Sequence, residues 1–213
     1  MPKTLVLFYS RGGNTARIAD AIAEGAKSVR FAEVDVRRIE DLAPEEVIAG
    51  VPGWRESREA LRRKYRTFGD AASLADYDGI ILGSPTRYGI MAAELKHVLD
   101  QTGPIWKAGK LVNKVGSAFT TVQTPHGGHE TTLWSIMTPM ANLGMIIVPP
   151  GYTDRAAFEG GSPYGATATT GAGAPTEADL AVARAQGKRV ATVVEWVTHA
   201  RAHEHGHAHG HAH

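Results

Sequence analysis

The chain contains no cysteine among its 213 residues. This absence excludes disulfide bonds, thiolate nucleophiles, zinc sites with sulfur ligands and iron–sulfur clusters. Any redox chemistry would therefore have to come from a bound cofactor.

The chain also lacks a long apolar run and a strong charge of either sign. No uninterrupted hydrophobic stretch approaches the roughly 18 residues that a membrane-spanning helix needs. The net charge is +1, whereas domains dedicated to nucleic acids are usually strongly basic. The apolar run at residues 4–9 is too short for the core of a signal peptide. We therefore expect a cytoplasmic globular protein with no membrane insertion and no nucleic-acid partner.

Histidine, by contrast, is in excess at one end of the chain. Seven of the ten histidines lie within residues 199–213, where they mostly alternate with glycine and alanine. Neutral imidazole binds zinc, copper and nickel, but a mobile segment offers no fixed catalytic geometry. We predict a folded domain over residues 1–198 and a flexible His-rich tail over 199–213 that is either native or a remnant of expression. Its possible metal ligands are His203, His205, His207, His209, His211 and His213.

Four short apolar runs, and one segment at residues 32–39 in which polar and apolar residues alternate, predict the strands of a sheet. They lie at residues 4–9, 32–39, 77–83, 115–121 and 145–149. Helical spacing of apolar residues is found at 14–27, 91–101, 133–140 and 176–197. Strands that alternate with helices indicate a parallel sheet covered on both faces. We predict an α/β three-layer sandwich with a five-stranded parallel sheet, whose ligands would lie beyond the carboxyl ends of the strands.

The first loop at that edge has the composition of a phosphate site. Its two glycines let the backbone turn tightly and expose N–H groups, and the start of the following helix adds a positive dipole. It is neither a Walker loop nor a Gly-x-Gly-x-x-Gly loop, and a simple helix cap is the alternative. The candidate phosphate ligands are Ser10, Arg11, Gly12, Gly13, Asn14 and Thr15.

The second loop combines a stiff backbone with an aromatic ring and a cation. We predict that Pro85, Thr86, Arg87 and Tyr88 contact a planar heterocycle. Arg87 would stabilise the negative charge of that ring when it is reduced. An ordinary turn with a surface arginine is the alternative.

The third loop carries hydroxyls, an amide and two imidazoles. Reduction by hydride also consumes protons, and histidine titrates in the useful range of pH. His126 or His129 is therefore a candidate proton donor, although histidines that only cap a helix are common. The loop contains Thr121, Val122, Gln123, Thr124, His126 and Gly127.

Two other segments stand out. The basic stretch at residues 54–68 has Trp54, Leu61, Tyr65 and Phe68 near one helical face. We interpret its charges as a solvated face, with a subunit contact or an anionic cosubstrate as alternatives. Residues 159–175 form a long loop of small residues, and such loops are usually functional or disordered.

Several of these segments together resemble known flavoproteins. Residues 10–15 look like the flavodoxin phosphate loop, Ser/Thr-x-Thr-Gly-x-Thr, with Gly12 in place of the middle threonine. Residues 77–89, residues 99–103 with Trp106, and residues 160–167 with 183–187 resemble the WrbA family of NAD(P)H:quinone oxidoreductases. The likeness extends over about residues 3–197, apart from the basic stretch.

The resemblance implies a flavodoxin-like fold with noncovalent FMN, and a homotetramer whose active sites lie between subunits. It implies that the three loops hold the phosphate and the ring of FMN, and that Trp106 borders the substrate pocket. Asn142 stands where the family often has a histidine that contacts the flavin. Gly12 stands where relatives often have a tyrosine that contacts the nicotinamide cosubstrate.

From the loops and the resemblance we expect an FMN-dependent enzyme that reduces quinones by two electrons with NADH or NADPH, in alternating half-reactions. One alternative is a flavodoxin-type electron carrier, a class that is usually shorter and markedly acidic. The other is a metal-binding or regulatory scaffold that has kept the fold without catalysis.

Overall fold

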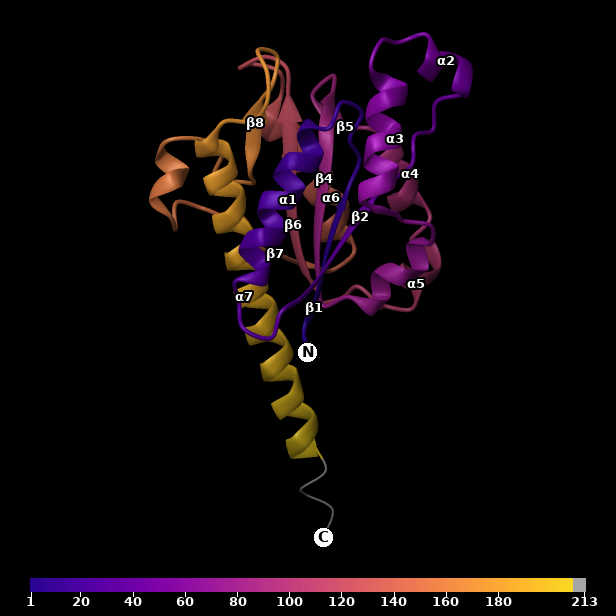
Figure 1. Cartoon of the computed structure of the whole chain (residues 1–213). Helices are drawn as coiled ribbons and strands as arrows, with labels where there is room; N and C mark the ends of the chain where they lie inside the picture. Colours follow the sequence, from indigo (N-terminus) through magenta and orange to yellow (C-terminus); the bar gives the residue numbers. More distant parts are fainter. Residues whose placement is uncertain (209–213) are drawn as a thin grey trace.

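The structure is a computed structural model that describes the backbone of residues 1–208 and the side chains of residues 1–202. Its elements alternate along the chain as the sequence predicts, with short additions (Figure 1). The strands are β1 (Lys3–Phe8), β2 (Glu33–Arg38), β3 (Arg66–Thr67), β4 (Gly79–Arg87), β5 (Ile90–Met91), β6 (Val115–Val122), β7 (Ile146–Ile147) and β8 (Thr167–Thr169). The α-helices are α1 (Asn14–Lys27), α2 (Glu45–Ala49), α3 (Trp54–Lys64), α4 (Ala93–Asp100), α5 (Gly103–Lys107), α6 (His129–Asn142) and α7 (Glu177–Ala208). Two 3₁₀-helices are η1 (Ala71–Asp76) and η2 (Arg155–Phe158).

The sheet has the order β3-β2-β1-β4-β6-β7, and every neighbouring pair on this path is parallel. The chain leaves the central β1 toward β2 on one side and later returns to β4 on the other side. The strand order therefore reverses between β1 and β4, and in sheets of this kind ligands bind beyond the carboxyl ends of the strands at such a point.

The number of strands differs from the five that the sequence predicts, because the described sheet contains eight. The additional strands β3, β5 and β8 are only two or three residues long, too short to show a periodic pattern. β8 lies inside the stretch predicted as a long loop and pairs in parallel with the end of β6. The helical pattern at residues 54–68 also ends early, since α3 stops at Lys64 and β3 follows.

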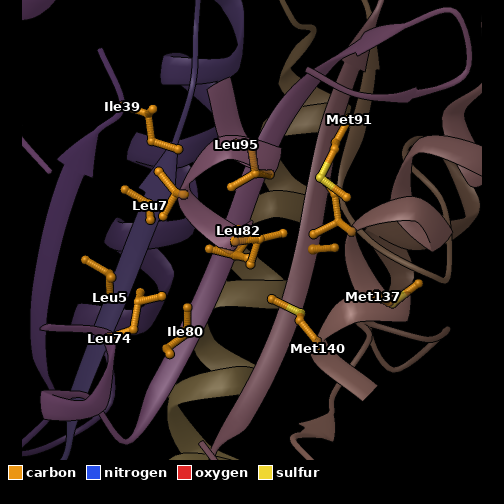
Figure 2. Close-up of a cluster of buried hydrophobic side chains, with 14 of the residues drawn as sticks. Leu5, Leu7, Ile39, Leu74, Ile80, Leu82, Met91, Leu95, Met137 and Met140 are labelled. Carbon is orange, nitrogen blue, oxygen red and sulfur yellow. The ribbon is translucent and has the colours of Figure 1, made fainter. Parts of the chain in front are cut away.

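Both faces of the sheet are covered by helices. Successive side chains of a strand point to opposite faces, so each central strand contributes to two buried clusters. On one face, Leu5 and Leu7 of β1 belong to the same buried cluster as Leu95 of α4 and Met140 of α6 (Figure 2). On the other face, the alternate β1 residues pack under α1 and α7.

The two helices of that second face approach each other very closely. A Cβ atom on Gly25 of α1 would lie 1.9 Å from the carbonyl oxygen of Arg184, and one on Gly187 of α7 would lie 1.9 Å from that of Ile22. Only glycine allows this spacing.

α7 continues beyond the predicted domain boundary at residue 198 and ends at Ala208 (Figure 1). The side chains of His203, His205 and His207, and all of residues 209–213, lie outside the described parts of the chain. The proposed flexibility and metal binding of the tail remain predictions.

Candidate functional site

A cavity of about 890 Å³ opens at the carboxyl ends of the central strands. This volume is within the range of roughly 300–1,000 Å³ that is typical of small-molecule sites. All three loops singled out in the sequence contribute to its lining. The lining residues are Ser10, Arg11, Gly12, Asn14, Thr15, Val51, Pro52, Gly53, Trp54, Ser57, Pro85, Thr86, Arg87, Tyr88, Thr121, Val122, Gln123, Thr124, Gly127 and Thr170.

The charge of the lining favours an anionic ligand. Its two charged side chains, Arg11 and Arg87, are both cationic, and it contains no carboxylate. Arginine binds phosphate well because its planar guanidinium presents several donors at once.

The first loop presents a helix start to the cavity. Gly13 adopts a φ of 88°, a left-handed conformation that glycine tolerates best, and its N–H donates to Ser10 Oγ at 3.1 Å. No side chain caps α1 in the described structure. A Cβ atom on Gly12 would meet no atom within 4 Å. The N–H groups of the first helical turn are thus available to an anion, as phosphate binding requires.

A buried hydrogen bond joins the first loop to the third. The hydroxyls of Thr15 and Thr121 lie 2.8 Å apart. Thr15 belongs to the first turn of α1, and Thr121 is the penultimate residue of β6. The bond fixes the helix start relative to the neighbouring strand end.

The hydroxyl of Thr86 ties the second loop to the third loop and to α6. It accepts from Gly89 N at 3.1 Å and from Thr132 Oγ1 at 2.8 Å, and it donates to the carbonyl oxygen of Gly127 at 3.3 Å. The two loops also touch at Gly128, where a Cβ atom would lie 2.7 Å from Gly89 Cα. Gly128 has a φ of 91°. These contacts hold the backbone of the second loop in place.

Arg87 and Tyr88 of the second loop both line the cavity. Arg87 Nη1 donates to the carbonyl oxygen of Thr86 at 3.0 Å. Tyr88 has a φ of 54° and its side chain is fully exposed. Such a conformation is uncommon for a residue other than glycine and often marks a functional position.

The two candidate histidines have different surroundings. His126 is exposed, and its side chain does not line the cavity. His129, the first residue of α6, is half-buried and its Nε2 lies 3.1 Å from Thr169 Oγ1 of β8. Burial lowers the pKa of His129 from its ordinary value. Of the two histidines, His126 is the more exposed to solvent.

Three predicted cofactor ligands do not line the cavity: Gly13, His126 and Asn142. The amide of Gly13 is used by Ser10, as described above. Asn142 is the last residue of α6, a helix of 14 residues that begins beside the cavity. At 1.5 Å per residue, that places Asn142 about 20 Å from the helix start.

Trp106, the predicted substrate contact, is also remote. It lies on α5, which packs against η1 at the opposite edge of the sheet. Its side chain is 57% exposed. Within one chain, neither Trp106 nor Asn142 reaches the cavity.

The sequence reasoning missed a fourth wall of the cavity, made by Val51, Pro52, Gly53, Trp54 and Ser57. It also missed Thr170, which lies just beyond β8 in the long loop and donates to the carbonyl oxygen of Val122. The Pro52-Gly53 pair before Trp54 is a turn signal that could have indicated a helix start. Nothing local showed that this helix start faces the first loop.

The basic stretch that follows is largely neutralised by carboxylates. Arg55 and Arg58 both pair with Glu45, Arg62 pairs with Glu40 and Glu59, and Lys64 pairs with Asp20 at 2.6 Å. These ion pairs favour the interpretation as a structural, solvated face.

The described residues contain no group of three or more histidine or carboxylate side chains that could hold a metal ion. None of their helices has both the length and the apolar character required to cross a membrane.

Comparison with known proteins gives consistent matches. Residues 3–158 match the model of the NADPH-dependent FMN reductase family. A curated NAD(P)H dehydrogenase (quinone) from Chromohalobacter salexigens is 41% identical over 199 residues, which cover 90% of this chain and 96% of that protein. A protein of the same name from Archaeoglobus fulgidus is 44% identical, with 92% and 98% covered.

Solved structures show the same architecture. A flavodoxin, WrbA-like protein from Agrobacterium tumefaciens has a TM-score of 0.64 and 26% identity, with 92% of this chain and 99% of that chain covered. Flavodoxin 1 from Bacillus cereus has a TM-score of 0.58 at 18% identity, with 89% and 97% covered, and shows the shared fold. The predicted flavodoxin-like fold and the resemblance to the WrbA family are both confirmed.

Proposed function

The chain belongs to the NADPH-dependent FMN reductase family, and from this premise we propose that it is an FMN-dependent NAD(P)H:quinone oxidoreductase. Relatives that are 41% and 44% identical over most of both chains are named NAD(P)H dehydrogenase (quinone). The main support for the proposal is that residues of all three loops line one cavity, which lies where the strand order of the sheet reverses.

The residues of the cavity fit FMN. The uncapped start of α1 and the guanidinium of Arg11 would hold the phosphate. Pro85, Thr86 and Tyr88 would contact the ring, with the backbone of this loop held by the bonds of Thr86. Residues 121–127 would close the remaining side.

Bound FMN would supply the redox chemistry, since it accepts a hydride from NAD(P)H and passes two electrons to a quinone. The protein's own part is to bind and orient the reactants and to adjust charge. Arg87 places a cation in the lining of the cavity, where it would stabilise the negative charge of the reduced ring. His126 is exposed on the adjoining loop and would give a proton to the product.

We further propose that the active protein is a homotetramer with its sites between subunits. Tyr88, Ile90, Trp106 and Trp134 are large apolar side chains that each expose more than half of their surface. Contact with another subunit would cover side chains of this kind. Trp106 and Asn142 would contribute to a cavity only from another subunit. A cytoplasmic location stays a prediction.

The two substrates would use the same cavity in turn. Steady-state kinetics test this directly. Varying NADH or NADPH at several fixed benzoquinone concentrations should give parallel double-reciprocal lines, as alternating half-reactions require. Intersecting lines would contradict the alternating order, and absence of turnover with FMN bound would favour an electron carrier.

A further inference from the structure

Trp54 lies outside the three predicted loops and yet lines the cavity. It is the first residue of α3, and its side chain is 8% exposed. The guanidinium carbon of Arg11 lies 4.1 Å from the centroid of its ring, a cation–π geometry. The only cation of the first loop is therefore in contact with an aromatic side chain of another element.

Asp41 fixes the indole in place. Trp54 Nε1 donates to Asp41 Oδ1 at 2.8 Å. The hydroxyl of Tyr9, the residue directly before the first loop, donates to the same oxygen at 3.0 Å. One carboxylate thus connects the end of β1 with the start of α3.

Arg38 is the cationic partner of that buried carboxylate. The side chain of Asp41 is 2% exposed, and Arg38 Nη2 lies 3.4 Å from its Oδ2. The other arm of Arg38 contacts Glu40. Burial, together with the carboxylates of Glu94 and Asp41, raises the pKa of Tyr9, so its hydroxyl keeps the proton that it donates. Paired buried charges of this kind hold a fixed geometry.

We propose that Trp54, anchored by Asp41, is a positioning residue that holds the guanidinium of Arg11 at the phosphate end of the cavity. This inference rests on the proposed binding of FMN. An unrestrained arginine side chain loses conformational entropy when it binds a phosphate. An arginine side chain that already packs against an indole loses less conformational entropy on binding. Trp54 therefore acts on the phosphate of the ligand through Arg11.

The test compares FMN with riboflavin, which has the same ring but no phosphate. Dissociation constants are measured by quenching of flavin fluorescence with the full-length apoprotein. Trp54→Leu and Arg11→Gln should each weaken FMN binding by about tenfold, the size expected for a partly desolvated cation–π contact and a phosphate contact. Riboflavin binding should change by less than about twofold, within the scatter of remote substitutions.

A double-mutant cycle separates positioning from a structural role. If Trp54 acts through Arg11, the double variant should bind FMN no more weakly than Arg11→Gln alone, because the effects of coupled residues do not add. Trp54→Phe keeps a ring for Arg11 but loses the bond to Asp41, and should fall between Trp54→Leu and the wild type. Trp196→Leu, at an exposed tryptophan of α7, is the matched control.

Two results would overturn the inference. Equal losses for FMN and riboflavin would make Trp54 a general wall of the cavity, and additive losses in the cycle would show that it acts independently of Arg11. Both results leave FMN binding by the wild type intact. Failure of the wild type to bind FMN would instead overturn the proposed function, and with it this inference.

Discussion

The hydroxyls of Thr15 and Thr121 meet in a buried hydrogen bond of 2.8 Å, although the two residues are 106 positions apart in the chain. Thr15 is the second residue of α1, and Thr121 lies near the end of β6. The contact links the first loop of the cavity to the third loop, so the geometry of the site depends on the packing of the fold.

Thr121→Val should weaken both stability and FMN binding, because it leaves the buried Thr15 hydroxyl without its partner. We expect a loss of about 1 kcal/mol in the free energy of unfolding and a severalfold rise in the FMN dissociation constant. Urea denaturation and fluorescence titration measure the two effects. Thr138→Val, which removes an exposed hydroxyl on α6, should leave both unchanged. Equal effects of the two substitutions would refute this role of the contact.

Gln186→Leu should destabilise the fold without reaching the cavity directly. Gln186 is fully buried, accepts from Ala166 N at 2.7 Å and donates to Ser117 Oγ and to the carbonyl oxygen of Ala118. Loss of these partners from a buried site should cost about 3 kcal/mol in the free energy of unfolding. Chemical denaturation measures the free energy of unfolding of this variant and of the control Gln101→Leu, which changes an exposed residue. A loss below about 1 kcal/mol, an ordinary surface effect, would show that other groups satisfy these atoms.

The stability of the protein should depend on pH through His129. Burial lowers its pKa in the folded state below the ordinary value of 6.5, so the unfolded chain binds this proton at a higher pH than the folded chain does. The free energy of unfolding should therefore fall as pH drops below about 6.5. His129→Gln should remove part of that fall, as measured by urea denaturation between pH 8 and pH 5. An unchanged slope in the variant would mean that His129 makes no such contribution.

Arg87→Gln should make the bound flavin harder to reduce. If Arg87 stabilises the negative charge of the reduced ring by about 1.4 kcal/mol, its loss lowers the two-electron midpoint potential by about 30 mV. Spectroelectrochemical titration measures the potential, with Arg63→Gln at an exposed position of α3 as the control. A potential that stays the same or rises would remove Arg87 from this role.

Much of the fold follows from the sequence, because buried parallel strands are continuous apolar runs. β1 and β4 are examples. Because their apolar runs also mark where these strands end, the loops that follow them could be predicted as ligand loops. The wall at Trp54 was not predictable, because its place beside Arg11 depends on Asp41 and Arg38, which are distant in sequence. β8 was missed because three residues of small or polar type show no strand pattern.

The proposed activity is the transfer of electrons from NAD(P)H to a quinone by way of bound FMN. Anaerobic stopped-flow absorbance tests it most directly: the FMN-loaded protein is mixed with NADH or NADPH, and then with benzoquinone. We expect the visible absorption band of the oxidised flavin to bleach and then to return in full on addition of quinone. A band that neither nucleotide bleaches, or that quinone does not restore, would contradict it.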